Sequence, residues 1–196
     1  MTHPEPGSAE IVARACASTA AVLATVHAAD FGRPTPCKSW TVKDVVNHTI
    51  DSAATYAELA ETGAWPRGGE AENSDRTGGD FRATFDREAA RLVAAFSAPG
   101  ALDKIVEMPF GGIPASICVW MAAGDIFTHG WDLAKATGQP SDLEPELAGQ
   151  LLTQIEKLLP ESMRGPEGEA PFGPQAEVAA SAPAADRLAA FEGRQP

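Results

Sequence analysis

One stretch of the sequence constrains the fold more than any other. Residues 113–134 form a nearly uninterrupted apolar run that also contains Asp125, His129 and Asp132. On a helical wheel of about 100° per residue, apolar or small residues of this run point in every direction. A helix that is apolar all round is surrounded by protein. The three polar side chains lie within roughly 60° of one another, so they form one narrow stripe inside a buried helix.

This polar stripe needs a partner. A buried carboxylate without one is strongly destabilising or takes up a proton, so the stripe should meet a polar group or a metal ion. Asp125 and His129 are four residues apart, which places both side chains over the same turn. Ligands from adjacent turns are the arrangement of the zinc-binding HExxH helix, although DxxxH is a weaker signal. Spacing alone favours an internal Asp125–His129 hydrogen bond, with Asp132 serving the next turn or the helix end.

A metal would need a third ligand from another segment. Of the remaining histidines, His27 lies at the end of the first predicted helix and His48 in the middle of the second. His48 is roughly 150° from the centre of the apolar stripe of its helix, so periodicity alone predicts a surface residue. Cys118 is about three turns, roughly 16 Å, from His129 and cannot share a site with it. Cys37 is interpreted as a small buried hydrophobe.

The apolar pattern and its capping residues predict an all-α protein. Thr41 with Asp44 forms a capping-box signature, Asp80 is expected to cap a third helix, and Gly138 is expected to end the fourth. We expect three helices to begin near Ser8, Thr41 and Asp80. Two further helices are expected to extend from Pro114 to Thr137 and from Pro145 to Met163. The short loops favour antiparallel neighbours in a four-helix up-and-down bundle with an additional C-terminal helix. We expect a single domain over residues 1–196, in which 164–196 form a mostly irregular C-terminal extension with a short final helix.

Composition excludes several classes of partner. The chain has 15 basic and 27 acidic residues, a net charge of −12, and no basic patch, which disfavours nucleic acid and anionic membranes. Three widely spaced cysteines imply no disulfide framework. The N-terminus lacks a signal-peptide pattern, and the charges within 113–134 disfavour a membrane span. We therefore expect a cytoplasmic protein; a homodimer stays open as its assembly.

Three segments carry a resemblance to a known family: "TPCKSWTVKDVVNHTI", "DIFTHGWDLAKATGQ" and "FGPQAEVAASAPAADRLAAFEGR". They resemble actinobacterial metal-binding proteins related to the mycothiol-dependent maleylpyruvate isomerase N-terminal domain, in the DinB-like superfamily. The resemblance implies a divalent metal, usually zinc, held by His48, Asp125 and His129. Relatives typically have Glu where this chain has Asp125, and the shorter side chain would bring the metal nearer the fourth helix or weaken its coordination. Asp132 would take the N–H of a ligand histidine.

The same resemblance implies a function. Three protein ligands leave a position for water or substrate, and a thiol bound there would lose its proton. The implied activity is a mycothiol-dependent S-transferase or isomerase that joins this thiol to an electrophile, which no residue identifies. The alternative is a non-catalytic metal-binding or stress-related module, and the plainest reading is an all-α domain with a structural Asp–His pair. Residues 63–79, rich in Gly and charge, are predicted to border the metal cleft as a lid.

Overall fold

The computed structural model describes residues 7–37, 39–66, 75–166 and 169–196, and this part of the chain is mostly helical. The predicted helical class is therefore confirmed. Its elements are α1 (Ala9–Leu23), η1 (Ala28–Asp30), α2 (Val42–Thr62), α3 (Phe81–Ser97), η2 (Ala101–Asp103), β1 (Ile105–Met108), β2 (Gly111–Pro114), α4 (Ala115–Thr137), α5 (Pro145–Leu158), η3 (Glu161–Met163) and α6 (Ala184–Phe191). The strands β1 and β2 form a two-stranded antiparallel sheet.

The predicted helix ends follow local chemistry. The Thr41 side chain accepts the backbone N–H of Asp44, while the Asp44 carboxylate accepts the N–H of Thr41, which is the expected capping box. Asp80 caps α3 by accepting the N–H of Ala83. Gly138 ends α4 at φ 74°, a left-handed conformation that glycine adopts without strain. Helix α5 stops at Leu158 rather than at the expected Met163, because a proline follows at position 160 and disfavours helix before it.

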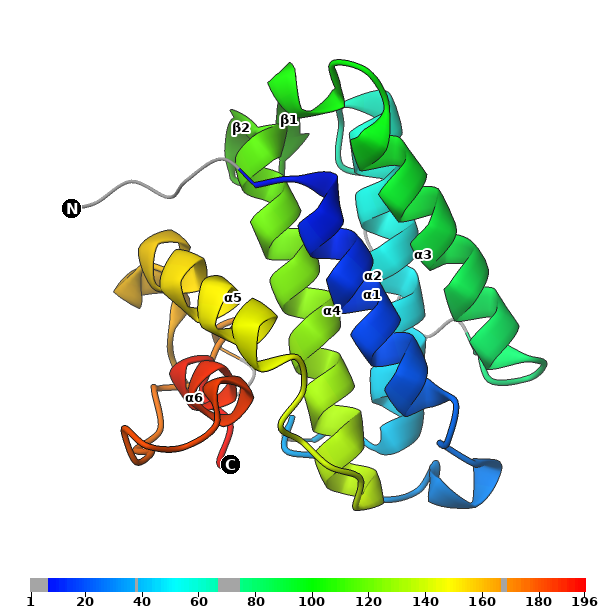
Figure 1. The fold of residues 1–196 in the computed structure, drawn as a ribbon, viewed down its shortest axis with the longest axis vertical. Coiled ribbons are helices and arrows are strands. Elements are labelled where there is room, and N and C mark those ends of the chain that lie inside the picture. Colours follow the sequence, from blue (N-terminus) through cyan, green and yellow to red (C-terminus); the bar gives the residue numbers. More distant parts are fainter. Residues whose placement is uncertain (1–6, 38, 67–74, 167–168) are drawn as a thin grey trace.

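Helices α1 to α4 lie side by side along the long axis of the molecule (Figure 1). The expected up-and-down order is wrong, because α2 and α3 run in the same direction. Arg91, near the end of α3, pairs with Glu61 near the end of α2 at 2.6 Å. Asp75 and Arg76, shortly before α3, instead pair with Lys43 and Asp51 in the first half of α2, whose 21 residues span about 30 Å. An extended chain covers roughly 3.3 Å per residue, so enough residues separate α2 from α3 to span this length. The connection therefore did not require α2 and α3 to be antiparallel.

Helix α4 is the buried centre of the fold. It packs against α1, α2, α5 and α6, which explains why its sequence is apolar all round. Trp131 is fully buried and Trp120 nearly so, as expected for core aromatics. Among the described residues, no helix has both the length and the apolar character needed to cross a bilayer.

Two glycines of α4 permit its close packing. A Cβ on Gly130 would collide with Thr19 Oγ1 of α1, and that hydroxyl donates to the Ile126 carbonyl of α4 at 2.9 Å. A Cβ on Gly124 would lie 3.0 Å from Ile155 Cδ1 of α5. The glycines therefore bring α1 and α5 close to α4 on either side of the segment that carries Asp125 and His129.

Substitution at these contacts should be measurable. We expect Gly130→Ala to lower the free energy of unfolding by about 1–3 kcal/mol, because the added methyl overpacks a buried helix contact. Gly149→Ala is the matched control: Gly149 lies in α5 with nothing within 4 Å of an added Cβ. There the gain in helix propensity should leave stability equal or raise it by up to about 1 kcal/mol. Urea unfolding of both variants tests this, and equal effects would contradict the packing argument.

Candidate metal centre

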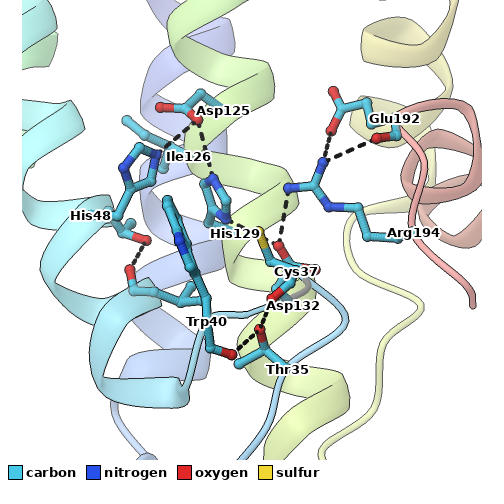
Figure 2. A network of polar contacts seen from close by, with 12 residues as sticks. Thr35, Cys37, Trp40, His48, Asp125, Ile126, His129, Asp132, Glu192 and Arg194 are labelled. Atoms are coloured by element: carbon cyan, nitrogen blue, oxygen red, sulfur yellow. Dashed lines mark hydrogen bonds and ion pairs between the residues drawn. The ribbon is translucent and has the colours of Figure 1, made fainter. Parts of the chain in front are cut away.

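Three side chains from two helices converge in the interior. His48 of α2 and His129 of α4 each place Nε2 3.4 Å from Oδ1 of Asp125. Figure 2 shows the carboxylate beside both rings. The ring centroids are 4.6 Å apart in an edge-on arrangement, and the three candidate ligand atoms lie within 4.8 Å of one another. All three sequence-derived candidates are thus brought together.

The spacing of these atoms suits a cation better than a hydrogen bond. A separation of 3.4 Å is longer than a normal N–H···O bond of about 2.7–3.2 Å. Tetrahedral zinc with ligand bonds of about 2.0–2.1 Å places neighbouring ligand atoms roughly 3.3–3.4 Å apart. Two imidazole nitrogens and one carboxylate oxygen are also an accepted zinc donor set. The residues present therefore fit a zinc ion in donor type and in both carboxylate–imidazole distances.

The two neighbouring histidines keep the Asp125 carboxyl ionised. Burial raises the pKa of this carboxyl, but His48 and His129 together lower that pKa well below its ordinary value. Asp125 is therefore an anion at neutral pH. An ionised carboxylate in a largely buried place needs positive charge beside it.

His129 is oriented by a second carboxylate. Its Nδ1 donates to Oδ2 of Asp132 at 3.0 Å, which directs Nε2 toward Asp125 and His48. Asp132 is fully buried, and the Arg194 guanidinium donates to the same oxygen at 3.2 Å. This is the position anticipated for a carboxylate behind a ligand histidine.

His48 is not the surface residue that periodicity predicts. Its side chain is 18% exposed, and Ser52 Oγ lies 3.3 Å from its Nε2. Trp40 covers both imidazoles: its ring stacks on His129 at a centroid distance of 5.6 Å and tilts against His48 at 4.7 Å. The wheel of α2 fails here because His48 faces a cavity next to α4, and an apolar pattern does not reveal polar partners on another helix.

Cys37 is also closer to the centre than its interpretation as a buried hydrophobe implies. It is half-buried, and its Sγ lies within 4.8 Å of ligand atoms of His129 and Asp132. A second cation there is disfavoured, because the guanidinium of Arg194 already supplies positive charge to Asp132. The other two cysteines are buried in apolar surroundings that raise their thiol pKa values to about 12, so they stay protonated: Cys16 and Cys118.

The centre opens into a cavity of about 1120 Å³. Helices α2, α4 and α5, the loop before α2 and the C-terminal segment form its walls, and His48, Asp125 and His129 line one part of it. The described parts of the predicted lid, residues 63–66 and 75–79, do not line it. The centre of that segment, 67–74, lies outside the described residues, so the lid stays a prediction.

The C-terminal segment supplies site residues that sequence reasoning missed. Arg194 and Glu192 line the cavity, and α6 docks on α4 through a 2.8 Å hydrogen bond from Trp131 Nε1 to Asp186. Gly193 has φ +94°, and a Cβ there would lie 2.7 Å from Gly173 Cα, so two glycines let the chain cross itself beside the site. The stretch "FEGR" contains Glu192 and Arg194, but no local pattern indicates that Arg194 contacts Asp132.

Comparisons with known proteins agree on the family. Residues 12–134 match the family model of the mycothiol maleylpyruvate isomerase N-terminal domain. Two uncharacterized proteins of Mycobacterium tuberculosis are each 37% identical over 183 residues, covering 92% of this chain and 94% of the relative. A crystal structure of the mycothiol-dependent maleylpyruvate isomerase matches with a TM-score of 0.52 at 20% identity. That match covers 64% of this chain and 58% of the isomerase chain, and it supports the shared fold.

Glu192 gives this region a testable pH dependence. Burial raises its pKa to about 7, although Arg194 opposes the rise. Between pH 4.5, the ordinary carboxyl pKa, and about pH 7, Glu192 of the folded protein keeps a proton that the unfolded chain has released. The free energy of unfolding therefore falls as the pH rises through this range. Glu192→Gln removes this proton uptake. We expect the variant to gain stability relative to wild type from pH 5 to pH 8, by up to about 3 kcal/mol. Urea unfolding at both pH values tests this, and a pH-independent difference would contradict it.

Proposed function

This chain belongs to the family of the mycothiol maleylpyruvate isomerase N-terminal domain. We propose that it binds one zinc ion, which would promote the reaction of a low-molecular-weight thiol with an electrophile. The ligands would be His48, Asp125 and His129. The observation that carries the proposal is the convergence of two imidazole nitrogens on one ionised carboxylate oxygen at 3.4 Å. By analogy with the family description, mycothiol would be the thiol and the reaction a transfer or an isomerisation.

An open coordination position is part of the proposal. Structural zinc sites use four protein ligands, whereas three leave a place for water or substrate. The adjoining cavity gives small molecules access to this place. Zinc bound there would lower the pKa of a thiol on the open position, so that it reacts as a thiolate.

The surrounding residues have separate tasks in this proposal. Asp132 would fix the tautomer and the ring orientation of His129 through Nδ1, and Arg194 would hold Asp132 in place. Trp40 would exclude water from one side of both imidazoles. A single-domain protein with the C-terminal extension 164–196 closing the cavity is part of the same proposal.

The second candidate is a metal-binding module without catalysis. Asp125 favours it, because the family resemblance implies a longer Glu at this position and a shorter carboxylate is a weaker scaffold for turnover. Both candidates require a metal, whereas an Asp–His pair with a purely structural role requires none. Two measurements therefore separate the three readings.

Metal content is the first measurement. Protein purified without a His tag should contain about one equivalent of zinc per chain by mass spectrometry, with three protein ligands. His48→Ala and His129→Ala should each reduce zinc affinity by at least 10-fold to 100-fold, since both remove a direct ligand. His27→Ala is the matched control, because His27 is exposed and belongs to neither candidate ligand group. Wild type without stoichiometric metal, or equal loss in all three variants, would refute the site.

Thiol consumption is the second measurement. Zinc-loaded wild type should accelerate the reaction of mycothiol with a model electrophile, and Asp132→Asn should slow it by about 10-fold to 100-fold through loss of His129 orientation. His129→Ala should abolish the acceleration. If wild type and His129→Ala consume thiol equally while wild type holds zinc, the non-catalytic module is the correct reading.

A further inference from the structure

The cavity wall has a polar part and an apolar part. The polar part comprises the candidate zinc ligands together with Thr128, Glu192 and Arg194. The remainder is mostly apolar, with the following side chains on its wall: Tyr56, Met121, Ile155, Leu158, Met163 and Phe172. A volume of about 1120 Å³ is slightly above the range of single small-molecule sites, so the cavity has room for a thiol and an electrophile together.

The apolar wall is built largely by this chain's own C-terminal part. Ile155 and Leu158 lie on α5, and Met163 and Phe172 follow it, all beyond the residues 12–134 that match the family model. Backbone hydrogen bonds between Phe172 and both Met163 and Gly165 fix this segment at 2.9–3.2 Å. This part of the wall therefore lies outside the segment that the family model matches.

Charge at the cavity argues against a small dianion. Among the described residues that line it, Arg194 is the sole lysine or arginine. Its guanidinium is already engaged by Asp132 at 3.2 Å and by Glu192 at 3.3 Å. Apart from the proposed zinc, a doubly charged acid would therefore find no unengaged cation among the described residues of the wall.

We infer that the electrophile is an uncharged molecule with an extended apolar group, of the alkyl enone class. This inference rests on the thiol-dependent function proposed above. The apolar group lies along Met163 and Phe172, and the carbonyl end faces the histidines. The thiolate sulfur forms a C–S bond with the β carbon, and the C=C π electrons move to the carbonyl oxygen as an enolate. A proton from water, equal to the one that the thiol released, then returns to the α carbon. Atoms and charge balance without an oxidant.

Binding of unreactive analogues tests the wall without any turnover. Saturated methyl ketones from butan-2-one to octan-2-one are titrated into the untagged full chain as purified, and dissociation constants are read from NMR shifts of the Trp indole N–H groups. We expect affinity to rise by up to about fourfold per methylene. Phe172→Ser should reduce that gain by at least half, and Met163→Ser should do the same if Phe172→Ser fails to fold. Phe110→Ser, at a 59% exposed site outside the cavity, is the matched control and should follow wild type.

The outcomes separate this inference from the proposed function. A flat ketone series, tighter binding of succinate than of octan-2-one, or equal effects of Phe110→Ser and Phe172→Ser would overturn the inference. If zinc-loaded protein adds thiol to but-3-en-2-one and to oct-1-en-3-one with equal kcat/KM, the thiol function stands and the apolar specificity is wrong. If neither enone is consumed but the ketone series holds, the apolar ligand class stands and the thiol function fails.

Discussion

The structure depends on one electrostatic arrangement: an ionised carboxylate held between two imidazoles that come from different helices. Asp125 is an anion in an interior place only because His48 of α2 and His129 of α4 both face it. A buried charge without such partners would cost several kcal/mol. The close approach of α2 and α4 is therefore not only a matter of apolar packing. It places Nε2 of both histidines 3.4 Å from the same carboxylate oxygen, and all three residues line a cavity.

Behind this arrangement, charges of alternating sign run from the centre to the C-terminal segment. His129 donates to Asp132, Asp132 accepts from Arg194, and Arg194 also contacts Glu192. Each member restrains the next, so the last residues of the chain help to fix a ligand that lies on α4. The elevated pKa of Glu192 arises chiefly from its burial, which the adjacent Arg194 guanidinium opposes only in part.

The helix ends and the candidate ligands were predicted from different features of the sequence. Local chemistry was sufficient for the ends of α2, α3 and α4, because caps such as Thr41 and Gly138 act within a few residues. The direction of α3 was wrong, because it is set by a long connection and by tertiary pairs such as Arg91–Glu61. Periodicity placed His48 on the surface, and only the family resemblance placed it at the site. The role of Arg194 depends on a contact across 62 residues of sequence, which no local pattern encodes.

The candidate ligands and the apolar wall come largely from different parts of the chain. The ligands lie within residues 12–134, the part that the family model matches, while α5 and the segment after it supply much of the apolar wall. Substitutions in that wall change the shape and polarity of the cavity without moving His48, Asp125 or His129. The glycine at position 124 connects the two parts, because it lets Ile155 of α5 pack directly beside the turn that presents Asp125. A larger residue at position 124 would push Ile155 away from this turn, so the contact at Gly124 helps to set the distance between α5 and the candidate ligands on α4.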